Sequence, residues 1–402
     1  MSSTLTFMCG CAINRDMYYI ACVPDEWYEE HGDEEPYTVM CFYQEETAEK
    51  WFCHSLPDWR VVSCVYPEPA AGSVRKVYAL SDTGEIECFS REGSVIEKIS
   101  DAENYGNLSA IRFIGTRFYV CGDEGQVYRK EGKKWVHFDK GLLGASIAED
   151  AKILAPRMEK AREQAKRMQE TPAFAEFSKL QAAALEKMAQ RQAAGEDIDD
   201  ILDEMASFDY ERLYDPEGFH DPFEDLDENM RLLHDINGLC EESIYVVGFN
   251  GFIAHFNGLE WRILEPVTRA HLGGIDIFSE DEIYITGSLG MGEEPNQQVI
   301  LRGNAREGFK VWHEWRQDTE FYAIAHFDHH LYISGSDGIY ALKDEKITRQ
   351  KISDTEVMSL EVKDGVLWAL SSNKLFRLKS GGQWEVFVHP NNAGQHSGAS
   401  RQ

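Results

Sequence analysis

The feature that most constrains the fold is a short pattern that occurs twice with its key residues at one constant offset. Residues 118–140 read FYVCGDEGQVYRKEGKKWVHFDK, and residues 244–265 read IYVVGFNGFIAHFNGLEWRILE. The matching positions are Gly122, Gly125 and Trp135 in the first segment and Gly248, Gly251 and Trp261 in the second. Aromatic and β-branched runs separated by Asn and Gly are typical of strands joined by tight hairpin turns. The pattern therefore predicts a repeat of short antiparallel strands.

The repeat extends along the whole chain. Each unit has an apolar A strand, a B strand of the type hydrophobic-Tyr-hydrophobic, a turn, a C strand and a D strand that often carries tryptophan. We expect the B strands at residues 17–20, 77–80, 118–121, 244–247, 283–286, 331–334 and 367–370, and D-strand tryptophans at Trp51, Trp135, Trp261, Trp312 and Trp384. A period of roughly 36 to 48 residues is typical of β-propeller blades. The sequence predicts an all-β fold, a seven-bladed β-propeller that closes without an exchanged strand.

Strand signals stop between residues 141 and 229, where apolar residues recur at helical spacing. We therefore predict an α-helical insertion between blades three and four. The expected organisation is blades one to three in residues 5–140, a helical and acidic insertion in 141–229, and blades four to seven in 230–389. The polar tail, residues 390–402, is expected to be disordered.

Long connections are expected to gather on one face of the propeller. In a four-stranded blade the D-to-A and B-to-C connections share one face, and the A-to-B and C-to-D connections share the other. The insertion is a D-to-A connection, and residues 24–36 and 288–298 are B-to-C connections of blades one and five. The long connection on the opposite face, residues 67–75, is rich in Pro, Ala and Gly. Long loops on a rigid scaffold commonly form binding surfaces.

Charge suggests what that face binds. The chain contains 70 acidic and 40 basic residues, a net charge of −30, and residues 196–228 hold fifteen acidic residues against one basic residue. Such a chain repels nucleic acid and anionic membranes and attracts basic proteins. A run of charges is also typical of a loop that is merely solvated, but aromatic residues within the acidic runs are favoured interface anchors. The predicted partner-binding residues are Trp27, Tyr28, Glu29, Glu30, Phe177, Leu180, Asp199, Asp200, Asp203, Glu204, Tyr210, Tyr214, Phe219, Phe223, Glu224 and Asp225.

The nine cysteines fall mostly at strand positions, which is typical of small buried hydrophobic residues in a reducing compartment rather than of a disulfide framework. The N-terminal residues lack a cationic start followed by an apolar core, and no run approaches the roughly 18 apolar residues of a membrane span. These observations predict a cytoplasmic protein with free cysteines.

Motifs for catalysis are missing from the sequence. It contains no Gly-rich phosphate loop, no G-x-S-x-G and no H-E-x-x-H. The most metal-like group is His326, Asp328, His329 and His330 in the A-to-B turn of blade six, where His326 and His330 could converge. Exposed imidazoles on a hairpin turn are the alternative. We therefore predict no enzyme, no catalytic residue, no metal ion and no cofactor.

The turn pattern G-x-x-G-x-[IV], seen in GDEGQV and GFNGFI and more loosely in GSDGI, carries a family resemblance. Together with the D-strand tryptophan it resembles seven-bladed propellers of the broad WD40 and photosystem-assembly-factor type. The Trp-Asp and Gly-His pairs of true WD40 repeats are missing. Acidic bacterial propellers are also similar to immunity proteins that neutralise toxins, which implies a role in masking a partner protein.

Three hypotheses follow. The first is a non-enzymatic protein that grips a basic partner, such as a toxin, with its acidic, insertion-bearing face. The second is a hydrolase or lyase with a site in the propeller funnel that uses His326, His329 or His330. The third is a scaffold that self-associates through the apolar stripe of residues 174–188, and the sequence leaves the oligomeric state open.

Overall fold

The computed structural model describes residues 3–32, 34–69, 73–143, 231–289, 297–316, 319–343, 346–350, 352 and 356–393, with four single positions at 156, 159, 162 and 166. The chain divides into two compact units, residues 1–146 with 230–402 and residues 147–229. The four single positions belong to the second unit and are helical and exposed. The rest of the predicted helical insertion, and residues 394–402 of the predicted tail, lie outside the described residues.

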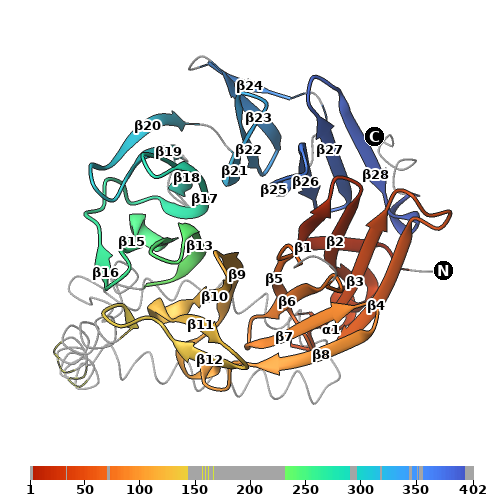
Figure 1. Ribbon diagram of the computed structural model, residues 1–402, viewed down its shortest axis with the longest axis horizontal. Coiled ribbons are helices and arrows are strands. Elements are labelled where there is room, and N and C mark those ends of the chain that lie inside the picture. The colour runs from red at the N-terminus through yellow and green to blue at the C-terminus, as the bar shows by residue number, and fades with distance from the viewer. Residues whose placement is uncertain are drawn as a thin grey trace, which may run out of the picture. The chain divides into compact units, whose positions relative to one another are not determined.

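The first unit is a seven-bladed β-propeller, as predicted. It contains seven sheets of four consecutive antiparallel strands, arranged radially with the first strand of each blade innermost (Figure 1). Blades one to three comprise β1 (Leu5–Asn14), β2 (Met17–Pro24), β3 (Tyr37–Gln44), β4 (Trp51–Pro57), β5 (Val61–Val65), β6 (Val77–Ser81), β7 (Glu85–Ser90), β8 (Gly93–Lys98), β9 (Leu108–Ile114), β10 (Arg117–Gly122), β11 (Val127–Glu131) and β12 (Lys134–His137).

The remaining four blades follow the same order. They comprise β13 (Leu233–Cys240), β14 (Ser243–Gly248), β15 (Ile253–Phe256), β16 (Trp261–Ile263), β17 (His271–Ser279), β18 (Glu282–Leu289), β19 (Gln297–Asn304), β20 (Gly308–Arg316), β21 (Phe321–Phe327), β22 (His330–Gly335), β23 (Gly338–Lys343), β24 (Lys346–Arg349), β25 (Val357–Lys363), β26 (Val366–Ser371), β27 (Lys374–Lys379) and β28 (Trp384–Val388). Short helices are α1 (Asp25–His31), η1 (Ala102–Tyr105), η2 (Asp123–Gly125), η5 (Phe249–Gly251) and η6 (Pro390–Asn392). All seven predicted B strands and all five D-strand tryptophans are confirmed.

The repeated glycines have a steric cause. A Cβ atom at Gly248 would lie 1.9 Å from the carbonyl oxygen of Leu232, and one at Gly122 would lie 2.3 Å from the carbonyl oxygen of Asn107. In both blades the B strand therefore passes directly against the segment that enters the A strand. Gly251 has a φ of +72°, a conformation that glycine adopts without strain. The pattern that revealed the repeat thus marks its closest backbone contacts.

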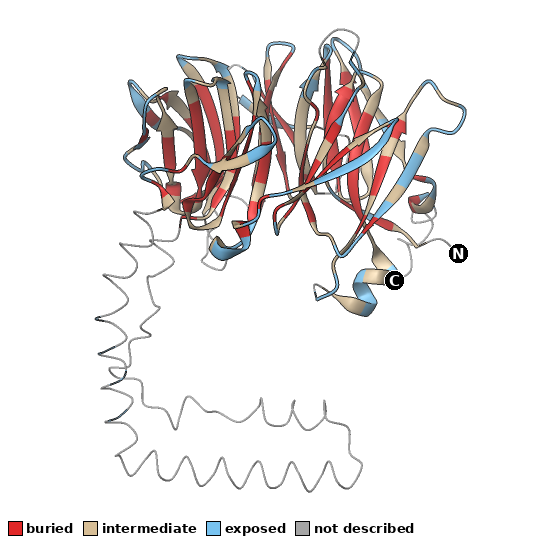
Figure 2. Cartoon of the chain, turned by 60° about the horizontal axis from the view of Figure 1, so that its bottom comes forward, coloured by how far each residue is buried: buried red, intermediate tan, exposed pale blue. Residues whose placement is uncertain are grey.

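The core lies between neighbouring blades rather than in one central layer. Burial is concentrated on the B and C strands, while the outer strands are more exposed (Figure 2). Each blade packs its side chains against the next, and the fully buried aromatic residues include Trp368, Tyr18 and Tyr43 at the junction of blades seven and one. Each such side chain stabilises the fold by about 1.5–3 kcal/mol.

The ring closes at this seam without an exchanged strand, as predicted. The side-chain amide of Asn392 accepts from the N–H of Leu5 and donates to its carbonyl oxygen, both at 2.8 Å, much as a neighbouring strand would. The N–H of Phe7 donates to the carbonyl oxygen of Ser372 at 2.7 Å. Side chains and loop backbone therefore supply the connection that an exchanged strand supplies in other rings.

A buried arginine completes the seam. The Arg377 side chain of β27 is fully buried and contacts Glu385 at 2.7 Å, Glu45 at 2.6 Å and Asp16 at 3.1 Å. Its guanidinium also lies 5.3 Å from the ring centre of Trp368. Asp16 and Glu45 belong to turns of blade one, so this one cation joins the last blade to the first.

The expectation that all cysteines are free is wrong for one pair. Cys41 and Cys53 are directly opposite each other on β3 and β4, with Cα atoms 4.2 Å apart, and form a disulfide. The other seven cysteines are free. Cross-strand register, which the sequence does not reveal, brings these two sulfurs together. No helix among the described residues is long and apolar enough to cross a membrane.

Candidate functional site

The structure places the described part of the predicted binding surface on helix α1. This helix is the B-to-C connection of blade one and projects from one end of the propeller (Figure 2). Asp25 begins it and is held by strand β1, because Thr6 Oγ1 donates to its carboxylate at 2.7 Å and its own N–H donates to the carbonyl oxygen of Thr4 at 2.9 Å. Gly32 ends the helix with a φ of +59°. The helix is therefore fixed at its base. We call the face from which it emerges the α1 face.

Trp27 is engaged within its own loop. Its ring stacks on His31 with ring centres 4.1 Å apart and on Tyr37 with centres 4.8 Å apart. Its Nε1–H donates to the carbonyl oxygen of Glu35 at 2.8 Å. Most of this side chain thus stabilises the loop that presents the helix.

The three residues that follow Trp27 face solvent. Tyr28 is 52% exposed, and Glu29 and Glu30 are also exposed. Their side chains form no hydrogen bond or ion pair with the other described residues. An unpaired tyrosine beside two carboxylates is therefore available to a partner. The other predicted binding residues, from Phe177 to Asp225, lie outside the described residues.

A hollow lies on the α1 face, where blades four, five, six and seven contribute to its lining. The sequence did not predict it. Its volume is about 520 Å³. It is lined by Leu232, His234, Phe249, His271, Gly273, Ser288, Leu289, Gln298, Glu320, Phe321, Tyr322, Glu356 and Met358. Most of these residues lie at or near the beginnings of the innermost strands, which surround the ring axis in Figure 1, and the others lie in or beside the B-to-C connections. The hollow therefore lies near the ring axis. Four blades contribute two to five residues each, which is why no local motif marks it.

The hollow combines aromatic walls with carboxylates. Phe249 stacks on His271 with ring centres 3.8 Å apart. The Tyr322 hydroxyl donates to Glu320 at 3.3 Å, and Glu356 is a second carboxylate neighbour of the same tyrosine. Burial, together with the hydrogen bond and charge of Glu356 and the charge of Glu320, raises the pKa of Tyr322. Tyr322 therefore stays neutral, and the carboxylates carry the charge.

His271 does not offset that charge at neutral pH. Burial, and then the nearby His234, lowers the pKa of His271 below its ordinary value. The His234 ring nitrogen Nδ1 lies 3.0 Å from the carbonyl oxygen of Leu272. The site is thus negative, partly enclosed and aromatic, a combination that suits a cationic side chain.

The group His326, Asp328, His329 and His330 does not form a site. His326 pairs with Leu331 and faces blade five, where its Nδ1 lies 2.6 Å from a carboxylate oxygen of Asp276. His330 pairs with Phe327, so its side chain leaves the opposite side of the sheet. The convergence that the sequence allowed for His326 and His330 does not occur, because neighbouring strand positions face opposite ways.

Among the described residues, potential metal ligands gather at one place that the sequence did not indicate. Cys41, Cys53 and His389 have ligand atoms within 4.8 Å of one another. The two sulfurs are bonded to each other, and burial lowers the pKa of His389, whose Nδ1 accepts from the N–H of Asn391 at 3.2 Å. In this state the group is a structural element of the seam.

The fold defines the class of protein, a seven-bladed β-propeller. No protein-family model matches the chain. The Immune protein Tsi7 of Pseudomonas aeruginosa is 26% identical over 152 residues, covering 37% of this chain and 46% of the relative. The match thus spans about half of that protein's length.

Solved structures of similar fold include YCF48 bound to D1 peptide, 10% identical with a TM-score of 0.49, covering 97% of this chain and 96% of that one. Another is the WD40 β-propeller domain of Doa1, 7% identical with a TM-score of 0.49, covering 98% of this chain and 96% of that one. Identities this low concern the fold alone.

Proposed function

We propose that this chain is a non-enzymatic binding protein that engages a basic protein partner through its α1 face, in the manner of an immunity protein that neutralises a toxin. The observation that carries the proposal is the hollow in which Glu320 and Glu356 both interact with Tyr322 beside an aromatic wall. The partial match to the Immune protein Tsi7 supports the same reading.

Recognition divides between the two parts of the face. An arginine or lysine of the partner enters the hollow. There it donates charge-assisted hydrogen bonds to the carboxylates and forms a cation–π contact with the aromatic rings. Tyr28 supplies an exposed aromatic anchor at α1, and the surrounding acids steer the partner into place. Binding would cover a cationic surface of the partner and thereby block its activity.

The partner is first identified by affinity capture with the full-length tagged chain from the native cell. Binding of the purified partner is then measured by calorimetry with the paired variant Glu320→Gln and Glu356→Gln. We expect the affinity to fall about a hundredfold or more, because hydrogen bonds to charged groups contribute about 1.5–3 kcal/mol each and the variant removes two charged acceptors. The affinity of the unmodified chain should also fall with added salt.

The matched control is a variant that loses the same two charges on the face opposite the α1 face. Glu46 and Glu49 are exposed in the C-to-D turn of blade one, away from the hollow, and the variant Glu46→Gln with Glu49→Gln should bind normally. If both paired variants bind alike, or if binding is insensitive to salt, the α1 face is not the interface.

Two other hypotheses, an enzyme and a self-associating scaffold, have no observation in their favour among the described residues. The described histidines of blade six are not brought together, so the hydrolase or lyase hypothesis has no assembled site there. Self-association through residues 174–188 rests on residues outside those described. Sedimentation of the variant Phe177→Asp with Leu180→Asp, compared with the unmodified chain, tests it directly.

A further inference from the structure

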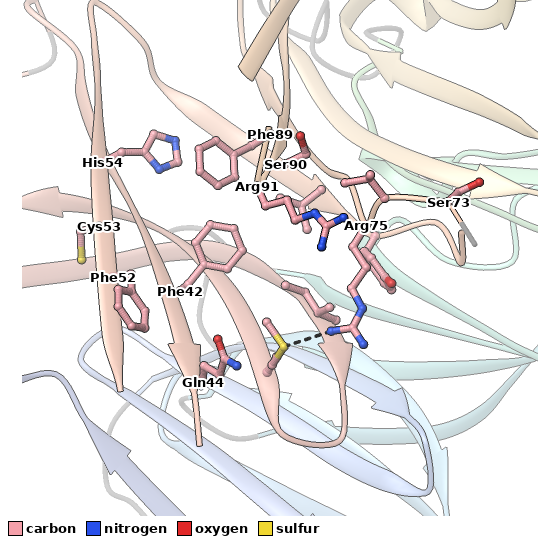
Figure 3. A pocket seen from close by; sticks show the side chains of 15 residues that line it. Phe42, Gln44, Phe52, Cys53, His54, Ser73, Arg75, Phe89, Ser90 and Arg91 are labelled. Carbon is pink, nitrogen blue, oxygen red and sulfur yellow. Dashed lines mark hydrogen bonds between the residues drawn. The ribbon is translucent and has the colours of Figure 1, made fainter. Parts of the chain in front are cut away.

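A second, larger pocket opens on the opposite face of the propeller, between blades one and two. Its volume is about 840 Å³, within the range of pockets that hold small molecules. It is bordered by the A-to-B connection of blade two and by the turn that follows β7, and Figure 3 shows its lining side chains. The pocket is therefore separate from the α1 face and its hollow.

One side of the pocket is an aromatic wall. His54 stacks on Phe89 with ring centres 4.3 Å apart and planes 10° apart, and Phe42 lies 5.3 Å from Phe89. Phe52 stands beside them and is 42% exposed. Three phenylalanines and an imidazole thus offer flat apolar surface to a ligand (Figure 3).

The other side carries two arginines. Figure 3 shows the guanidinium groups of Arg75 and Arg91 across the pocket from Phe42, with that of Arg75 directed at the sulfur of Met17. Neither forms an ion pair with a carboxylate among the described residues, and Arg75 donates a long hydrogen bond to the sulfur of Met17 at 3.5 Å. Both arginines are exposed and thus accessible to a ligand.

The absence of acids from the lining sets this pocket apart from the rest of the chain. None of its fifteen lining residues is Asp or Glu, although acidic residues outnumber basic ones by 70 to 40 in the sequence. The carboxylate beneath the wall, Glu87, is 2% exposed and is engaged by His54 at 3.0 Å and by the Tyr19 hydroxyl at 3.3 Å. A ligand in the pocket therefore meets two arginines and no free carboxylate.

We infer that this pocket binds a small molecule with a flat aromatic body and an anionic head group, a carboxylate or a phosphate. The aromatic body would lie against Phe42 and Phe89, and the anionic oxygens would accept paired hydrogen bonds from the guanidinium groups. This site requires no partner protein and is independent of the function proposed for the α1 face.

The test uses two dyes that share one aromatic body. 8-Anilinonaphthalene-1-sulfonate carries an anionic head, and N-phenyl-1-naphthylamine is its uncharged counterpart. Fluorescence titrations compare the full chain with the variant Arg75→Gln and Arg91→Gln. We expect the affinity for the anionic dye to fall about tenfold or more while the affinity for the neutral dye changes less than twofold. Competition by 1-naphthoate and by 1-naphthyl phosphate then identifies the preferred head group.

Two further variants complete the design. Phe52→Ala removes exposed aromatic surface and should lower the affinity for both dyes. The control, Arg262→Gln with Arg306→Gln, removes two arginines whose side chains are 66% and 72% exposed outside the pocket, and should change neither affinity. The inference is overturned if the control weakens the anionic dye as much as the pocket variant does. It is also overturned if both dyes bind the pocket variant as they bind the unmodified chain.

Discussion

Replacing Arg377 with methionine tests how much of the propeller's stability resides in its seam. Methionine retains much of the side-chain length and can still pack against Trp368, but it removes the cation shared by Asp16, Glu45 and Glu385. Removing one partner of a buried ion pair costs about 3–5 kcal/mol. We expect a loss near 3 kcal/mol, because the three carboxylates are 29%, 36% and 38% exposed and water solvates them once they are unpaired.

The loss should depend on pH, which separates charge from packing. Hydrogen bonding from Arg377 lowers the pKa of Glu45. In Glu385 burial raises the pKa, but Arg377 and Lys379 together outweigh it, so the pKa of Glu385 is lowered as well. A carboxylate with a lowered folded-state pKa stabilises the fold above its unfolded pKa of about 4.5, and this contribution is lost as the pH falls through the folded-state value. The difference between the two proteins should therefore be full at pH 7 and shrink below about pH 4.

The assay is urea unfolding followed by tryptophan fluorescence at pH 7 and pH 3.5. Arg306→Met is the matched control, since the Arg306 side chain is 72% exposed and its ion pairs should contribute less than about 1 kcal/mol. A destabilisation by Arg377→Met that is equal at both pH values would show that packing alone accounts for it. A loss below about 1 kcal/mol at pH 7 would refute the role given to the seam.

Three further predictions concern stability. Burial raises the pKa of Glu361 to about 7, so the folded chain holds a proton that the unfolded chain releases above about pH 4.5. Ionisation thus costs stability as the pH rises through this window, and Glu361→Gln should add up to about 3 kcal/mol at pH 8 and little at pH 4.5, as thermal melts at both values would show. Cys53→Ser should cost about 2–3 kcal/mol in urea unfolding under oxidising conditions, and a difference that persists in dithiothreitol would contradict the disulfide as its cause. Gly248→Ala should cost about 2–3 kcal/mol by crowding, against about 1 kcal/mol for Gly308→Ala, where a Cβ meets nothing within 4 Å; equal losses would argue against the close approach.

The repeat predicted most of the fold because its signals are local. Gly248, Gly251 and Trp261 lie within 14 residues of one another along the chain. The turn and the outer strand of a single blade require all three residues. The alternating hydrophobic pattern of the strands and the turn residues between them therefore indicated the strand order, the face on which each connection lies and the closure of the ring. The Cys41–Cys53 bond depends instead on which residues of two strands stand opposite each other, which composition does not reveal.

The sites were harder to predict because they are assembled from distant segments. Glu320 and Phe249 meet in the hollow although 71 residues separate them, and Arg75 faces a wall that begins at Phe42 in another blade. Tyr28 was predictable, since an aromatic residue among acids in a long loop signals an exposed surface. A sequence pattern within one blade therefore cannot predict a site that side chains from two or four blades form together.

The junction of blades seven and one also affects how the chain folds. Each sheet consists of four consecutive strands, so a blade can form as soon as its own stretch of chain is available. The hydrogen bonds between Asn392 and Leu5 span 387 residues, and the entropic cost of closing a loop rises with its length. Contacts of such long range form late in folding. The open ring, with the edges of blades one and seven still unpaired, is therefore the expected last intermediate, and seam residues should govern the final step without altering how single blades form.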